Sequence, residues 1–372
     1  MNRLLGAWRR LLWSLGVVRP FPPPHIEDEK QARAVRQALG ALLAKDEDQF
    51  DRLFLDGEPM TLQASDRPLI EVLAAAGYAK TTAGAVRPCV RVFNLYDLVI
   101  ATDLATHDAE DQVFYLALEQ VFLVRSMDVR SGDHVLELCL GSGVNAIAAA
   151  RRGAARIVGV DISERALAFA AANAAVNLSS KHPPLETLRG NLFDPLAEGD
   201  RFDLILVNPP FELVPPGARY YLHSHGGEDG LDVIRALLPG VSKRLRPGGR
   251  FELITWSPGN QDSERVTDLV RAALPGFRIE VRRLDQRPLE GRLTPFRDRP
   301  GYGPWRDRLA SEGLTHVWGV HIRAFNDGPA ELVRVNATAD VRACEEVLSQ
   351  WGIELRSEHA PSTHTRTGAA KP

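Results

Sequence analysis

A carboxylate and two glycines are spaced along this chain as they are in nucleotide-binding α/β units. Gly141 and Gly143 follow the apolar run 135–140, and Asp161 ends a second apolar run at 156–161. The separation of about 20 residues is the one at which an acid meets the two hydroxyls of a ribose, because one carboxylate can accept both hydrogen bonds. Glycines allow the backbone to approach a ligand where a Cβ would collide. These residues therefore predict a site for a ribose-bearing ligand.

A second group with chemical potential is the turn Asn208-Pro209-Pro210-Phe211, which directly follows the apolar run 202–207. The two prolines fix the backbone, and the aromatic ring offers a face for stacking a planar group. An ordinary turn at a strand end is the alternative. Its position after a buried strand, together with the other segments, favours a functional turn.

The elements that must position these residues alternate between strand and helix over residues 133–325. This alternation predicts an α/β fold with a mostly parallel, Rossmann-like sheet and helices on both faces. Ligands of such sheets bind at the carboxyl ends of the strands. Four segments lie just past expected strand ends: 139–143, 161, 191–194 and 208–211. We therefore expect them to converge on one edge of the sheet.

Together, these segments resemble class I S-adenosylmethionine-dependent methyltransferases of the NPP(Y/F) type. The glycine-rich stretch 226–232 adds a likeness to release-factor glutamine N5-methyltransferases, which covers residues 135–256. The resemblance implies a class I methyltransferase fold with S-adenosylmethionine as cofactor. The helices and strands expected at 27–102 do not resemble the helical recognition domain of the release-factor enzymes.

The resemblance also implies a role for each site residue. It assigns these residues to the cofactor: Glu137, Cys139, Gly141 and Gly143 on the amino-acid and ribose side, Asp161 at the ribose, Asn191 and Leu192 at the adenine, and Asn208. It assigns catalysis to Asn208, Pro209, Pro210 and Phe211. The Asn208 side-chain oxygen and the Pro209 carbonyl would hold the two N–H groups of a planar nitrogen, which is otherwise a poor nucleophile. The expected acceptor is a carboxamide or exocyclic amine of a protein glutamine, an RNA or DNA base, or a small molecule.

Composition bounds these interpretations. The chain has 372 residues, a formal net charge of -3 and a pI near 6.4, so no global basic field indicates a nucleic-acid binder. Three scattered cysteines (Cys89, Cys139, Cys344) indicate a reducing compartment, and we expect the cytoplasm. No apolar run has the length of a membrane span. His223 and His225 lack a completing ligand at metal-binding spacing, so we expect no metal.

The predicted organisation has four parts. Residues 1–24 form an amphipathic segment and a proline-rich linker, for which docking on protein is favoured over contact with a membrane surface through 1–18. Residues 25–105 form a small α+β module, with a strand break near Asn94, for substrate recognition or cover. Residues 106–355 form the methyltransferase domain, and the polar tail 356–372 is expected to be disordered.

Three expectations concern less regular segments of the catalytic part. Residues 114–124 are predicted to be one apolar helix. Residues 286–304 are predicted to be a long loop, whose arginines (Arg287, Arg292, Arg297, Arg299) could meet an anionic substrate. The runs 316–325 and 331–335, separated by Asn326-Asp327-Gly328, predict a hairpin.

Other function classes stay open at this point. A small-molecule methyltransferase of secondary metabolism would share all the cofactor signals, and a catalytically silent methyltransferase-like scaffold would also keep the fold. A nicotinamide oxidoreductase shares the first strand, turn and helix. It is disfavoured because residues 140–145 lack the third phosphate-approach glycine and because it has no use for the Asn-Pro-Pro-Phe turn.

Overall fold

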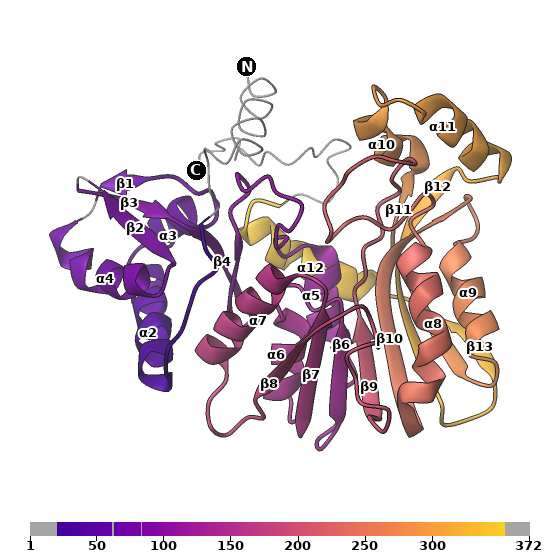
Figure 1. Cartoon of the computed structure of the whole chain (residues 1–372), viewed down its shortest axis with the longest axis horizontal. Helices are drawn as coiled ribbons and strands as arrows, with labels where there is room; N and C mark the ends of the chain where they lie inside the picture. The colour runs from indigo at the N-terminus through magenta and orange to yellow at the C-terminus, as the bar shows by residue number, and fades with distance from the viewer. Residues whose placement is uncertain (1–20, 62, 83, 354–372) are drawn as a thin grey trace.

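The computed structural model describes residues 21–61, 63–82 and 84–353 (Figure 1). The interpretations given for residues 1–18 and for the tail 356–372 fall outside the described residues. Within them, the chain forms a large central sheet with helices packed on it, and a smaller α+β part beside one end of that sheet.

The central sheet has eight strands in the order β13-β11-β12-β10-β9-β6-β7-β8 within the described part of the chain. The strands are β6 (His134–Leu138), β7 (Arg156–Asp161), β8 (Leu185–Arg189), β9 (Phe202–Val207), β10 (Leu245–Gly259), β11 (Arg278–Pro288), β12 (His316–Phe325) and β13 (Glu331–Arg334). Only β12 runs antiparallel to its neighbours β10 and β11, and every other pairing in this sheet is parallel. This arrangement confirms the predicted mostly parallel α/β fold.

Both faces of the sheet are covered, and the apolar strands explain why. In β9, Leu204 and Leu206 enter one apolar cluster, while Ile205 and Val207 enter the cluster on the other face. Helices α5 (Leu118–Ser126), α6 (Val144–Arg151) and α12 (Thr338–Gln350) contribute to the first cluster, and α8 (Asp232–Arg244) and α9 (Arg265–Ala273) to the second. A strand buried on both faces needs apolar residues at every position, which is why the run carries no polar alternation.

The smaller part is built from helices and two small sheets. Its elements are α2 (Glu29–Lys45), α3 (Glu47–Phe54), β1 (Met60–Thr61), η1 (Ala64–Asp66), α4 (Arg67–Ala75), β2 (Ala79–Thr82), β3 (Ala85–Pro88), β4 (Val90–Leu95) and β5 (Leu98–Asp103). Strands β4 and β5 form a hairpin whose turn lies at Tyr96 and Asp97, so the strand break expected near Asn94 comes two residues later.

Helix α7 (Glu164–Asn177) joins this part to the central sheet. It begins at the predicted cap, where the Ser163 side chain accepts from the Ala166 amide. At its far end, two buried asparagines bond the edge of β5: Asn173 bonds both backbone groups of Ala101, and Asn177 bonds those of Val99. The β4–β5 hairpin also enters the apolar cluster under α5 and α6, so the two parts share one core.

Three predictions about less regular segments are wrong. Residues 286–304 are not a loop: they complete β11 and form α10 (Leu289–Leu293), η2 (Thr294–Phe296) and the start of α11 (Tyr302–Ser311). The hairpin at 316–335 does not form, because β12 inserts between β10 and β11, and β13 pairs in parallel with β11 instead. The helix predicted from 114 begins at Leu118, since residues 114–117 are irregular.

Candidate active site

The four predicted segments do lie at the carboxyl ends of neighbouring strands. The glycine turn follows β6, Asp161 ends β7, residues 190–192 follow β8, and the Asn-Pro-Pro-Phe turn follows β9. Because β8, β7, β6 and β9 are consecutive and parallel in the sheet, these ends share one edge. Each strand therefore delivers one part of the candidate site.

The turn after β6 is held in a conformation that ordinary residues rarely adopt. Cys139 (φ 58°), Gly141 (φ 55°) and Gly143 (φ 76°) all have left-handed backbones. A Cβ on Gly141 would meet nothing within 4 Å, whereas a Cβ on Gly143 would lie 2.9 Å from the Ala170 Cβ of α7. Gly143 is thus needed for packing, while Gly141 leaves space at the strand end where a ligand can approach.

Glu137 supports this turn from below. Its carboxylate is fully buried and accepts from Asn145 Nδ2 (2.8 Å) and from the Ala146 amide (2.7 Å) at the start of α6. Burial raises the pKa of Glu137 to about 8, although both hydrogen bonds act in the opposite direction. The side chain therefore fixes the start of α6 to β6, and its burial keeps the carboxylate away from a ligand.

Asp161 ties the turn after β6 to the end of β7. Its Oδ2 accepts from the Gly141 amide and its Oδ1 accepts from the Ser163 amide, both at 2.9 Å. The residue is half-buried, and burial raises its pKa, partly offset by these backbone donors. Each carboxylate oxygen keeps a further lone pair, so the group can still accept two hydroxyl donors from a ligand.

Asn191 and Leu192 lie next to Asp161 at the end of β8. The Gly190 amide donates to the Asp161 carbonyl (3.0 Å), which brings the following residues to the same edge. Asn191 is exposed, and Leu192 is half-buried with a left-handed backbone (φ 50°). The Leu192 side chain packs against the apolar cluster that α8 and α9 cover, so the residue borders this strand end from the core side.

The Asn-Pro-Pro-Phe turn carries an unusual side chain. Asn208 Oδ1 is buried and has no hydrogen-bond partner among the described residues. An acceptor buried without a donor costs stability, and functional sites are where such atoms are found. Pro209 is buried and Phe211 is half-buried, so the turn is enclosed by the protein. Asn208 Oδ1 can still accept a hydrogen bond from a ligand.

The glycine-rich stretch holds this turn in place. The Glu212 amide donates to the Ser224 carbonyl (2.8 Å), and the Gly226 amide donates back to the Glu212 carbonyl (3.0 Å). A Cβ on Gly226 would lie 2.7 Å from the Phe211 Cα, and one on Gly230 would lie 2.5 Å from the Phe211 carbonyl oxygen. The glycines are therefore required because two backbones pass in direct contact.

The segment α10–α11 covers the far side of the turn, and sequence reasoning missed it. Arg292 of α10 pairs with Glu212, and its guanidinium lies 4.5 Å from the centre of the Trp256 ring. The indole of Trp305 on α11 donates to the Glu228 carbonyl (2.9 Å). Three of the four arginines named above are thus engaged by acids of the protein itself: Arg287 by Asp285, Arg292 by Glu212, and Arg297 by Glu290.

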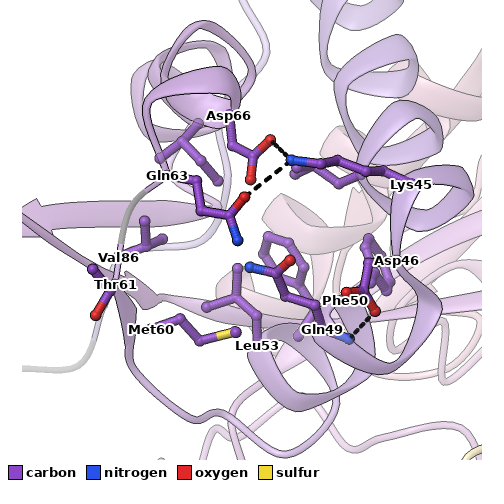
Figure 2. Close-up of a pocket in the computed structure, with 13 residues that line it drawn as sticks. Lys45, Asp46, Gln49, Phe50, Leu53, Met60, Thr61, Gln63, Asp66 and Val86 are labelled. Carbon is purple, nitrogen blue, oxygen red and sulfur yellow. Dashed lines mark hydrogen bonds and ion pairs between the residues drawn. The ribbon is translucent and has the colours of Figure 1, made fainter.

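A pocket elsewhere does not compete as the site. It lies between α2, α3 and β1, and offers about 30 Å³, enough for a water molecule but not for a nucleoside (Figure 2). Its cation, Lys45, points to Asp66 (2.6 Å) and to Gln63 (3.3 Å), so its charge is matched. Within the described residues, no cluster of three metal-binding side chains occurs, and no helix is long and apolar enough to cross a membrane.

Comparison with known proteins gives one family over this region. Residues 119–262 match the family described as "Methyltransferase small domain". A release factor glutamine methyltransferase of Geobacter sulfurreducens is 40% identical over 126 residues, which cover 31% of this chain and 42% of that protein. A ribosomal protein uL3 glutamine methyltransferase of Bradyrhizobium diazoefficiens is also 40% identical over 126 residues, 32% of this chain and 39% of that protein.

A putative protein N5-glutamine methyltransferase of Methanocaldococcus jannaschii is 29% identical over 177 residues, 46% of this chain and 83% of that protein. The chain thus spans less than half the length of the first two relatives. The family match at 119–262 includes the strand ends described above. The predicted resemblance is confirmed: over its catalytic region, the chain is similar to class I S-adenosylmethionine-dependent methyltransferases, and among them to the glutamine methyltransferases.

Proposed function

We propose that the protein is an S-adenosylmethionine-dependent methyltransferase that methylates a planar nitrogen, the side-chain amide of a protein glutamine. The observation that carries the proposal is the buried, partnerless oxygen of Asn208 at the strand edge that also holds Asp161. The relatives are named for glutamine methylation of a release factor and of a ribosomal protein, which supports the same acceptor class.

The residues at the edge fit the cofactor. Asp161 can accept from two hydroxyls, and Gly141 leaves open space beside it. Half-buried Leu192 follows at the next strand end, where the adenine would lie. Glu137 contributes by fixing the start of α6 to β6, and half-buried Cys139 lies at the end of β6 on the cofactor side. When bound, the cofactor supplies a methyl group activated by a sulfonium.

The turn after β9 would position the acceptor. Asn208 Oδ1 accepts one amide N–H and the Pro209 carbonyl accepts the other, which directs the nitrogen lone pair towards the methyl carbon. Phe211 stacks on the planar group, and Pro210 keeps the backbone from relaxing. Positioning of this kind can remove about 7–11 kcal/mol from a barrier, so most of the rate enhancement requires no strong base.

We assign residues 106–355 to the methyltransferase domain and 25–105 to a module that selects the acceptor or covers one side of the catalytic domain. We propose a cytoplasmic location, which the acceptor proteins named for the relatives and the three free cysteines support. Small metabolites and nucleic-acid bases are the acceptors against which the proposal is tested.

The first experiment measures cofactor binding and methyl transfer together. Calorimetry should show binding of S-adenosylmethionine and its demethylated product, and no binding of NAD. Transfer of labelled methyl groups is then measured with purified release factor, ribosomal protein uL3 and cell extract, followed by protease, RNase or size-cutoff treatment. Label that resists protease but is lost with RNase or passes the size cutoff would refute a protein acceptor.

The second experiment changes Asn208→Ala. We expect cofactor affinity to change little and single-turnover transfer to fall by roughly 10²-fold or more, as for the loss of one preorganised hydrogen-bond partner. The matched control is Asn326→Ala, at an exposed asparagine after β12. Normal turnover of the Asn208 variant, or methyl groups found on oxygen or carbon, would refute the planar-nitrogen chemistry.

A further inference from the structure

A histidine that the mechanism above does not use lies beside the Asn-Pro-Pro-Phe turn. His223 belongs to the loop between this turn and α8. The next residue, Ser224, accepts from the Glu212 amide through its carbonyl, and Gly226 packs on the Phe211 backbone. His223 is therefore one residue away from Ser224, whose bond to Glu212 holds the chain directly after the proposed catalytic turn.

Three contacts fix its ring. The imidazole stacks on Phe114 (centroids 4.7 Å apart, planes 25° apart) and on Tyr221 (5.3 Å, 16°), and its Nδ1 lies 2.7 Å from Ser224 Oγ. The remaining nitrogen, Nε2, is buried and has no partner among the described residues. A ring this firmly held with one nitrogen unused is unlike a histidine that serves only packing, since buried polar atoms are normally satisfied.

The ring is neutral at physiological pH. Burial lowers the pKa of His223 to about 4. Two ionisable side chains lie close to it: Tyr221 in the stack, whose hydroxyl bonds Asp108, and His225 on the same loop. If Nδ1 carries the hydrogen and donates it to Ser224 Oγ, Nε2 presents a bare lone pair.

We propose that His223 Nε2 contacts the methyl acceptor and takes the proton that its nitrogen loses, a role that rests on the proposed function. The nitrogen forms its bond to the methyl carbon as the carbon–sulfur bond breaks, with both electrons of that bond staying on sulfur. One N–H bond of the acceptor then breaks, its electrons return to nitrogen, and Nε2 binds the proton, which passes to water once the product has left. A methylated amide cation is a far stronger acid than imidazolium, so this transfer is downhill even for a weakly basic histidine.

The two buried atoms without partners, Asn208 Oδ1 and His223 Nε2, suit these two different roles. Asn208 Oδ1 can only accept, so it orients an N–H without removing it. A neutral imidazole can both accept a hydrogen bond and bind the proton fully. The low pKa keeps Nε2 free of a proton throughout the physiological range, so a methyl acceptor always meets it in the competent form.

Nuclear magnetic resonance of the full-length chain with ¹⁵N-labelled histidine tests the ring directly, without an acceptor. We expect His223 to show the Nδ1–H tautomer and no protonation between about pH 5.5 and pH 8, given a pKa of about 4. His223→Phe identifies the signal by its loss. An Nε2–H tautomer, or protonation near the ordinary histidine pKa, would overturn the proposal.

Activity supplies the second test, with the acceptor protein that accepts label from the wild type. His223→Phe keeps the stack on Phe114 but removes the nitrogen, and we expect cofactor affinity to stay within about twofold while single-turnover transfer falls by roughly 10²-fold or more. His25→Ala, at an exposed histidine of the smaller part, is the matched control and should transfer normally. Free imidazole should restore part of the rate to His223→Ala, an effect that a purely structural role would not give.

The outcomes separate the two proposals. If the wild type transfers methyl groups and His223→Phe is equally fast, the proton-accepting role is wrong and the proposed function stands. If His223→Ala is slow but imidazole restores nothing and cofactor affinity falls in parallel, His223 is structural. If the wild type neither binds the cofactor nor transfers methyl groups, the proposed function is wrong, and the proton-accepting role of His223 is wrong as well.

Discussion

Substituting Gly226 by alanine tests whether the glycine-rich stretch positions the proposed catalytic turn. The added Cβ would lie 2.7 Å from the Phe211 Cα, 2.8 Å from the Phe211 carbonyl carbon and 2.9 Å from the Gly230 Cα. Ordinary contact begins at 3.4 Å, so the nearest pair must separate by 3.4 − 2.7, about 0.7 Å. All three neighbours are backbone atoms, so no side chain can rotate away and the turn itself must move.

The expected cost follows from that displacement. A misplacement of about 1 Å at a reacting centre can cost roughly 10²-fold in rate, so a shift of this size should cost roughly 10- to 10²-fold. Overpacking of this kind also destabilises a protein by about 1–3 kcal/mol. Cofactor affinity should be nearly unchanged, because β6 and β7, which hold the glycine turn and Asp161, do not contact Gly226 in the hydrogen-bonding pattern.

The assay is single-turnover methyl transfer into the accepting protein, alongside calorimetry with the cofactor and thermal unfolding. Gly303→Ala on α11 is the matched control, since a Cβ there meets nothing within 4 Å and its backbone is unstrained. A Gly226→Ala protein that is folded and transfers at the wild-type rate would refute the reasoning. A parallel loss of cofactor affinity would show instead that the displacement spreads across the whole strand edge.

Three further predictions concern the cofactor side and the core. Asp161→Ala should weaken cofactor binding by roughly 1.5–3 kcal/mol, measured by calorimetry, and unchanged affinity in a folded protein would exclude a ribose contact. Asn173→Ala leaves buried backbone groups of Ala101 and Ser142 without partners, so denaturant unfolding should show a loss of at least about 2 kcal/mol, and a smaller loss would mean that water replaces the amide. Glu137 has its pKa raised to about 8, so the folded state binds more protons than the unfolded state above the ordinary value, and stability should fall as pH rises from about 4.5 to about 8. Glu137→Gln should remove this slope from the unfolding free energy, and an identical slope in the variant would assign it elsewhere.

The positions of the strands that carry the site and the convergence of the four segments were predictable because they depend on local pattern and on one topological rule. Apolar runs ending in glycine, aspartate or asparagine give the strands and their ends without knowledge of packing. The parallel arrangement then places those ends at a single edge, which the structure reproduces for Gly141, Asp161 and Asn208.

The segments that were mispredicted depend on contacts far away in the sequence. The helices α10 and α11 carry glycine, proline and arginine, and their few apolar residues acquire a helical role only by packing on Trp256 and Leu213. Residues 326–328 do carry a turn signal. However, β12 pairs with β10 along one edge and with β11 along the other, so neither edge of β12 is left for a hairpin partner. The sequence drew attention to His223 only as half of a possible metal pair, because an unused nitrogen is visible only once its neighbours are placed.

Asn173 shows why the amino-terminal part cannot be treated as a detachable accessory. Its side-chain amide bonds β5 and, through the Ser142 carbonyl at 2.9 Å, the glycine turn proposed to face the cofactor. Removing residues 1–102 would delete the β5 residue that the Asn173 side chain bonds. It would also remove Ile100 from the apolar core under α5 and α6. Loss of activity on truncation would therefore arise from a disturbed cofactor turn as readily as from lost recognition.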